Sequence, residues 1–186
     1  MQRHNTEQEE RALIGQFDCF TQEQVKEINK EIKKNIFEKE PLADAAQDAS
    51  KIGDFFIISC GPLMKLIHPW LYECQLINKQ VFGYDIYWDF HLETLNYNVY
   101  GTGGEYGWHI DRKTGGIVDM KLTCLLNLSE EPYEGGDFSM FCNNKKIKFT
   151  SGMGLVVNSL IAHKVTPITK GERITLTYWA EGPTWR

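Results

Sequence analysis

The feature that most constrains the fold is the pattern of the second half of the chain. From about residue 84, apolar and polar side chains alternate with a period of two, which is typical of β-strands. Glycines at 103–104, 135–136 and 171 interrupt the alternation, so turns recur at roughly the 8–12-residue spacing of sandwiches. This pattern predicts about eight short strands in a mainly β fold, arranged as a sandwich or jelly roll like that of cupins.

The sequence suggests where these strands lie. Beyond the alternation that starts near residue 84, we expect strands at 95–100, 120–128, 138–141, 146–149, 155–157, 163–165 and 173–179. The segments 138–141 and 146–149 have the spacing of a hairpin. Two further strands are expected earlier in the chain, within residues 12–20 and at 55–58.

The first half of the chain also predicts two helices. Thr21 has the character of an N-cap, and Gln24 occupies the matching position of a capping box. Apolar residues at helical spacing follow, and they predict a helix of about 15 residues. Gly61-Pro62 begins a second predicted helix, roughly 62–80, which Pro69 is expected to kink or split.

The length and composition of the chain limit the kinds of protein it can be. The 186 residues are 42% hydrophobic and 24% charged, which favours one well-buried globular domain. The net charge of −5 argues against nucleic acid as a partner, because phosphate binding requires a basic face. The five cysteines form no C-x-x-C pair, and neither a signal peptide nor a transmembrane stretch is evident. We therefore expect free thiols, a cytoplasmic location and no membrane association.

His109 and Asp111 lie two residues apart in the stretch Tyr106-Gly107-Trp108-His109-Ile110-Asp111. In an extended strand such residues point to the same face, which brings an imidazole and a carboxylate together. His163, in a later β-rich segment, supplies a second imidazole. Two histidines and one carboxylate form the facial triad of non-haem Fe(II) oxygenases, which leaves three coordination positions open. These three residues are therefore a candidate metal site.

The same ligand types leave alternatives open. Two histidines and a carboxylate also serve catalytic zinc, so a zinc hydrolase is one alternative. A cupin-like module that binds metal without turnover is another. Arg173 follows His163 by ten residues and begins a segment with strand alternation. A guanidinium near the metal offers a forked donor to a carboxylate, which suits a dicarboxylate such as 2-oxoglutarate and favours an oxygenase.

From about residue 90 onward, the chain resembles the Fe(II)/2-oxoglutarate-dependent oxygenases, most closely the prolyl 4-hydroxylase-like group. The motifs that carry the resemblance are Tyr100-Gly101, the His109 and Asp111 stretch, Tyr133-Glu134-Gly135-Gly136-Asp137-Phe138, and the segment from His163 to Arg173. The resemblance implies a double-stranded β-helix, a cupin-like jelly roll buttressed by helices. It divides a single domain, 1–186, into a helical support region at 1–83 and a β-helix core at 84–186.

The resemblance also implies the roles of individual residues. The implied catalytic set is His109, Asp111 and His163 as Fe(II) ligands, with Arg173 as the partner of the 5-carboxylate of 2-oxoglutarate. The further cosubstrate contacts are Tyr100, Thr177 and Asn127, although Asn127 stands where some relatives carry a tyrosine. The expected substrate contacts are Tyr106, Trp179 and Arg112. Arg112 belongs to a segment, 112–119, that we expect to close over substrate; the alternative is a solvated surface charge.

The activity implied by the resemblance is hydroxylation of an unactivated C–H bond. Fe(II), 2-oxoglutarate and O2 take part, succinate and CO2 are coproducts, and ascorbate is an accessory reductant. A carboxylate at Asp111 favours hydroxylation, because relatives that halogenate carry a small residue there. A peptidyl residue such as proline is the first-choice substrate, with a peptide or protein as partner, and a free amino acid or small molecule is the alternative. The sequence gives no indication of oligomeric state.

Overall fold

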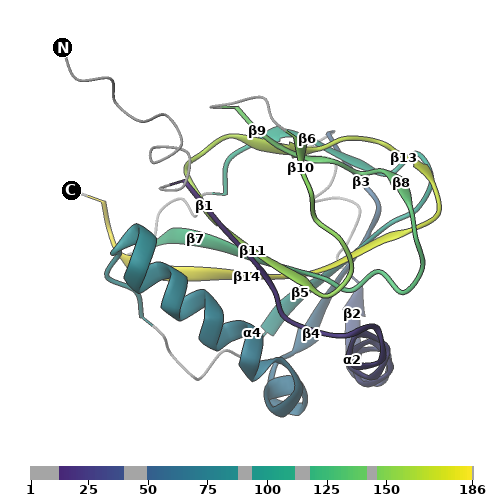
Figure 1. The fold of residues 1–186 in the computed structure, drawn as a ribbon, viewed down its shortest axis with the longest axis horizontal. Coiled ribbons are helices and arrows are strands. Elements are labelled where there is room, and N and C mark those ends of the chain that lie inside the picture. The colour runs from purple at the N-terminus through teal and green to yellow at the C-terminus, as the bar shows by residue number, and fades with distance from the viewer. Residues whose placement is uncertain (1–12, 40–49, 88–93, 112–117, 142–145, 186) are drawn as a thin grey trace.

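The computed structural model describes residues 13–39, 50–87, 94–111, 118–141 and 146–185. Two β-sheets face each other, and the helices cover the outer face of the larger sheet (Figure 1). No helix in these described ranges is both long and apolar enough to cross a membrane. The arrangement confirms the prediction of a jelly roll buttressed by helices.

The larger sheet has seven strands, and every neighbouring pair is antiparallel. In spatial order the strands are β1 (Ile14–Asp18), β11 (Met153–Asn158), β7 (Val118–Asn127), β14 (Arg173–Pro183), β5 (Thr94–Tyr100), β4 (Asp54–Ser59) and β2 (Ile36–Lys39). Strands β7 and β14 form the centre of this sheet, where most side chains are buried. These central strands are the long apolar segments that the sequence predicted.

The smaller sheet has five strands and carries two of the three candidate metal ligands. In spatial order its strands are β10 (Lys146–Ile147), β9 (Phe138–Met140), β12 (His163–Val165), β6 (Glu105–His109) and β3 (Lys51–Ile52). The predicted hairpin is present, because β9 and β10 pair in antiparallel register. A separate two-stranded ladder joins β8 (Glu134–Gly135) to β13 (Ile168–Lys170).

Helix α2 (Gln22–Asn35) begins where the sequence predicted. The Thr21 hydroxyl accepts from the Gln24 N–H, and the Gln24 side chain accepts from the Thr21 N–H, which completes the capping box. A cap of this kind contributes about 1 kcal/mol to helix stability. The buried face of α2 also reaches the larger sheet: the Asn29 amide donates to the Leu128 carbonyl at 2.7 Å.

Helix α4 (Met64–Ile77) follows a 3₁₀ turn, Gly61–Leu63, and leads into a π-helical turn, Asn78–Phe82. The helix continues through Pro69, so the expected split is wrong. Pro69 and Lys65, four residues earlier, are both exposed. The Lys65 carbonyl that loses its N–H donor can therefore bond to water, which makes the proline tolerable.

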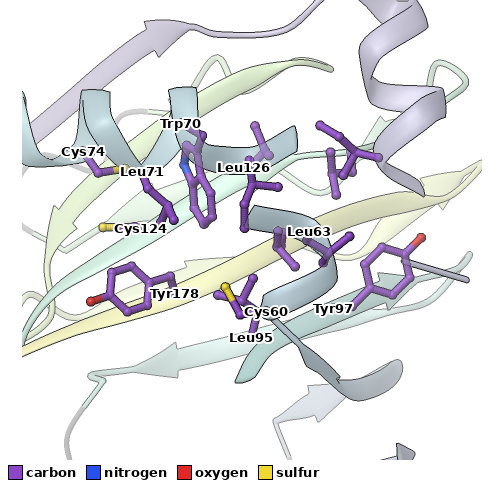
Figure 2. Close-up of a cluster of buried hydrophobic side chains, with 14 of the residues drawn as sticks. Cys60, Leu63, Trp70, Leu71, Cys74, Leu95, Tyr97, Cys124, Leu126 and Tyr178 are labelled. Atoms are coloured by element: carbon purple, nitrogen blue, oxygen red, sulfur yellow. The ribbon is translucent and has the colours of Figure 1, made fainter. Parts of the chain in front are cut away.

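The main core lies between the helices and the larger sheet. Figure 2 shows Trp70 of α4 above Cys124 and Leu126 of β7, with Tyr178 of β14 close by. Trp70 is fully buried and is the largest side chain of this cluster. A second cluster, around Phe138 and Leu155, fills the space between the two sheets.

One expectation about the first half of the chain requires correction. Residues 84–87 are not a strand, because the Asn78 side chain bonds both the N–H and the carbonyl of Tyr84 and holds that backbone in a loop. The continuation of the predicted strand at 88–93 lies outside the described residues. The strands expected at 12–20 and 55–58 are present as β1 and β4, which join the larger sheet. Two further strands that the sequence did not predict, β2 and β3, join the larger and the smaller sheet.

Candidate active site

The three candidate metal ligands come together at one end of the smaller sheet. His109 ends β6 and His163 begins β12, and the two residues are directly paired between these neighbouring strands. The Nε2 atoms of His109 and His163 lie 3.7 and 3.4 Å from the Asp111 carboxylate oxygens. The ligand atoms of the three residues all lie within 4.8 Å of one another. Two imidazoles and a carboxylate thus surround one point, as the sequence predicted.

Backbone carbonyls hold both imidazoles in the orientation that metal binding requires. The Nδ1 of His109 lies 2.8 Å from the Gly107 carbonyl, and the Nδ1 of His163 lies 2.8 Å from the Ile161 carbonyl. A carbonyl can only accept, so each Nδ1 donates its proton, and Nε2 is the ring atom that faces Asp111 and can bind a metal. Such outer hydrogen bonds are typical of metal-binding histidines.

Asp111 lies two residues beyond the end of β6 and is nevertheless held in place. Its N–H donates to the Ser159 carbonyl at 2.9 Å, and its Oδ2 accepts from the Thr123 hydroxyl at 2.5 Å. Burial by itself raises the pKa of Asp111, but hydrogen bonds from His163 and Thr123 and the nearby imidazoles outweigh it, so the pKa is lowered. The residue is therefore a carboxylate at neutral pH and can bind a cation.

Arg173 is the first residue of β14 and is almost completely buried, at 1% exposure. Its guanidinium lies over the rings of Tyr100 and Phe149, at 5.6 and 5.5 Å from their centroids. Among the described residues, neither its Nε nor its Nη2 has a hydrogen-bond partner. A buried charge without an acceptor is costly, so this pair of donors fits an anionic ligand that enters the cavity.

Arg173 and the metal ligands line the same cavity. The donor set of two imidazoles and one carboxylate, without a thiolate, fits Fe(II). The two orphaned guanidinium donors fit one carboxylate of a dicarboxylate such as 2-oxoglutarate. The residues present therefore accommodate both groups.

Comparison with protein families agrees with this geometry. The sequence model of the 2OG-Fe(II) oxygenase superfamily matches residues 95–181, a range that contains the triad and Arg173. Residues 95–181 are thus similar to this superfamily. The predicted resemblance is thereby confirmed.

Curated relatives of this region include PKHD-type hydroxylases. The one from Stutzerimonas stutzeri strain A1501 is 32% identical over 94 residues, which are 46% of this chain and 42% of that protein. The one from Shewanella oneidensis is 36% identical over 92 residues, which are 46% of this chain and 41% of that protein. The matched segment thus spans less than half the length of these relatives.

Solved structures share the fold over nearly the whole chain. A viral collagen prolyl hydroxylase from Paramecium bursaria Chlorella virus-1 superposes with a TM-score of 0.69 at 18% identity, covering 91% of this chain and 96% of that one. A prolyl-4-hydroxylase from Pseudomonas putida has a TM-score of 0.69 at 19% identity, covering 92% and 93%. At these identities the likeness establishes the jelly-roll fold.

The cavity that holds the triad and Arg173 contains most of the other residues predicted from the sequence. Tyr106 stacks on the His109 ring, with centroids 3.4 Å apart and planes 12° apart, and Tyr100 lies beside Arg173. Thr177 and Trp179 line the same cavity. The Trp179 indole N–H is a further buried donor without a partner among the described residues, so the cavity wall offers another hydrogen bond to a ligand.

One predicted residue, Asn127, does not line this cavity, and another, Arg112, cannot be placed. Asn127 is fully buried, and its amide bonds the Tyr133 hydroxyl, the Phe149 carbonyl and the Ser129 N–H. The described cavity lining does not include it, and its amide joins the end of β7 to the loop before β11. Arg112 and most of the predicted closing segment lie outside the described residues.

Sequence reasoning missed several polar residues of the cavity. Asn98, on β5, donates to the Thr177 hydroxyl at 2.9 Å, and its place two residues before Tyr100 on the same strand could have revealed it. Thr123 also shares its strand face with a predicted residue, Asn127, four positions later. Lys51 lines the cavity from the two-residue strand β3, which is too short to show a pattern.

A larger hollow lies elsewhere on the jelly roll, between the loop before β8 and the loop after β10. Tyr133 and Phe149 form part of its wall, and the Tyr133 hydroxyl donates to the Phe149 carbonyl at 2.9 Å. None of the three candidate metal ligands lines this hollow. The chemistry therefore belongs to the smaller cavity.

Proposed function

We propose that this protein is an Fe(II)- and 2-oxoglutarate-dependent dioxygenase that hydroxylates an unactivated C–H bond, with succinate and CO2 as coproducts. The observation that carries this proposal is the buried guanidinium of Arg173, which lies in the same cavity as the three candidate metal ligands. Its Nε and Nη2 have no hydrogen-bond partner in the described part of the chain. A metal-only module has no use for such an anchor, and a zinc hydrolase needs only an activated water. The three ligands would hold Fe(II), which with 2-oxoglutarate and O2 supplies the oxidising power.

The protein's own groups position the cosubstrate. Arg173 would pair with its far carboxylate, and the charge-assisted pair would satisfy the two orphaned donors. The Thr177 hydroxyl accepts from Asn98, so its own proton is free to bond the same carboxylate. The rings of Tyr100 and Phe149 flank Arg173 and exclude water from this pair, which strengthens it.

Trp179 and Tyr106 would shape the side of the cavity that faces the substrate. The Trp179 N–H would donate to an oxygen of the bound ligands, and Tyr106 holds the His109 ring by stacking. An Asp at position 111 supplies the third protein ligand, which supports hydroxylation rather than halogenation.

The proposed substrate is a residue of a peptide or protein, with proline first. Two neighbours in fold are named prolyl hydroxylases, and another, from Trichoplax adhaerens, was solved with a peptide fragment of hypoxia-inducible factor. A free amino acid or small molecule is the alternative. We further propose that residues 1–186 work as one oxygenase domain, because β1, β2, β3 and β4 complete the two sheets that hold the site.

One assay tests the class of activity. The purified protein, given Fe(II), O2 and 2-oxoglutarate, should form succinate, and Zn(II) in place of Fe(II) should abolish this reaction. A hydrolase or a non-catalytic module would form no succinate under either condition. Peptides with and without proline, compared by mass spectrometry for the gain of one oxygen atom, then decide the substrate. Oxidation of a free amino acid but of no peptide would favour the alternative.

A further inference from the structure

Two buried hydroxyl groups stand behind the Asp111 carboxylate. Thr123 on β7 and Ser159 just after β11 are 2% and 0% exposed. The Thr123 hydroxyl lies 2.5 Å from Asp111 Oδ2 and 3.2 Å from the Ser159 hydroxyl. The ionised carboxylate can only accept, so Thr123 donates its single proton to Asp111. Ser159 must then donate to Thr123, which gives the chain of hydrogen bonds one direction, from Ser159 to Asp111.

The backbone fixes the same arrangement. The Ser159 carbonyl accepts from the Asp111 N–H at 2.9 Å, and the Ser159 N–H donates to the Lys121 carbonyl at 3.1 Å. Asp111 is thus held at its main chain and at its side chain by residues of the larger sheet, although it follows a strand of the smaller one. Without these contacts, a residue two positions beyond the end of β6 would be free to turn its side chain.

Only one of the two carboxylate oxygens takes part in this network. Thr123 engages Oδ2, whereas Oδ1 has no hydrogen bond among the described residues and lies 3.7 Å from His109 Nε2. A facial triad leaves three open positions only if its carboxylate binds through one oxygen. A carboxylate that is free to rotate can bind through both oxygens and occupy a position that the cosubstrate or O2 requires.

We propose that Thr123, supported by Ser159, is a positioning residue that makes Asp111 a one-oxygen metal ligand and keeps the third coordination position open. This inference rests on the proposed function, because it assumes that the triad holds Fe(II) together with 2-oxoglutarate. Thr123 would thus support the ligand Asp111 directly, and Ser159 would support Thr123 from behind. Both residues lie outside the His-x-Asp motif.

The test is the variant Thr123→Val, which keeps the branched shape and removes the hydroxyl. Mn(II) binding, followed by electron paramagnetic resonance, should weaken by at least about tenfold, as for other outer partners of metal ligands. At saturating Fe(II) without O2, 2-oxoglutarate should also bind more weakly, and the visible charge-transfer absorption of its iron chelate should fall. Thr123→Ser, which restores a hydroxyl, should recover both signals, and Ser159→Ala should give a smaller loss of the same kind.

The control is Ser139→Ala, which removes another buried hydroxyl, on β9, outside the cavity lining. It should bind Mn(II) and 2-oxoglutarate as the wild type does. The inference is overturned if Thr123→Val binds both like the wild type, or if Thr123→Ser is as weak as Thr123→Val. Wild-type protein that binds neither Fe(II) nor 2-oxoglutarate would overturn the proposed function itself, a result that is distinct from either of these.

Discussion

At the scale of single residues, the histidines of the triad should be indispensable. His109→Ala or His163→Ala leaves two protein ligands, which hold Fe(II) poorly, so succinate formation should fall to background. Calorimetric titration with Mn(II) should show the matching loss of metal affinity. The control is His68→Ala, since His68 is exposed on α4 and stacks only on Tyr72. Full activity in either triad variant would remove the metal assignment.

Arg173 should determine the affinity for 2-oxoglutarate without affecting the affinity for the metal ion. Arg173→Ala removes a buried charge-assisted pair, an effect of roughly 2–5 kcal/mol, so the apparent KM for 2-oxoglutarate should rise well over tenfold. Mn(II) affinity should persist, because the triad is untouched. A KM equal to that of the wild type would place the carboxylate anchor elsewhere in the cavity.

Arg173 should also lower the thermal stability of the protein when no ligand is bound. Arg173 places a positive charge in an almost fully buried position, where its Nε and Nη2 have no hydrogen-bond partner among the residues that the structure describes. An apolar side chain of similar length avoids that desolvation cost, so Arg173→Met should melt at the same or a higher temperature than the wild type. In the presence of Mn(II), adding 2-oxoglutarate should raise the melting temperature of the wild type only. A large fall in the melting temperature of the ligand-free variant would contradict this account.

Residue types and spacing predicted the four central residues of the site, and the structure brings them together. The pattern could not predict which amides and hydroxyls face the cavity. Asn127 sits on a suitable strand, but its amide is used by Tyr133, Phe149 and Ser129. Thr123 was missed because its role depends on Asp111 approaching from another sheet, a long-range contact that no local pattern encodes.

At the scale of elements, α4 should contribute much of the core's stability through one side chain. Trp70 is fully buried between α4 and the larger sheet (Figure 2). Trp70→Ala should lower the free energy of unfolding by roughly 3–5 kcal/mol, because it removes a large apolar surface and leaves a cavity. Urea denaturation measures this loss. Tyr72→Ala, on the exposed face of the same helix, should change stability little.

Sequence motifs predicted the ends of helices and strands well where every residue of the motif was present. The capping box at Thr21 and Gln24 marked the start of α2, and both of its hydrogen bonds are present. The predicted split at Pro69 is wrong, because α4 continues through it and the exposed Lys65 carbonyl that lacks a donor can bond to water. The prediction failed again at residues 84–87, where the Asn78 side chain competes with strand pairing for the Tyr84 backbone.

At the scale of the whole molecule, alkaline pH should destabilise the fold. Burial raises the pKa of Cys19 and of Cys60 to about 11, and burial also raises the pKa of Cys74, Tyr97 and Tyr178. Above pH 9 the unfolded chain loses thiol protons that the folded chain retains, so the free energy of unfolding should fall as pH rises from 9 to 11.

Urea titrations between pH 7 and 10.5, with a reductant present, measure this effect. The stability should be nearly constant below the pKa of an unfolded thiol and should decline above it. Cys74→Ala should flatten the decline, because Cys74 is fully buried and its thiol stays neutral in the folded protein. A stability that stays level or rises up to pH 10.5 would contradict the prediction.

The division of the site between two sheets has a mechanical consequence. His109 and His163 lie in the smaller sheet and Arg173 in the larger, so a dicarboxylate bound at both ends would connect the two sheets. In the proposed reaction CO2 leaves, and succinate is one carbon shorter than 2-oxoglutarate. Succinate would then no longer reach both sheets as the cosubstrate did, so the proposed reaction would also weaken the binding of its own coproduct.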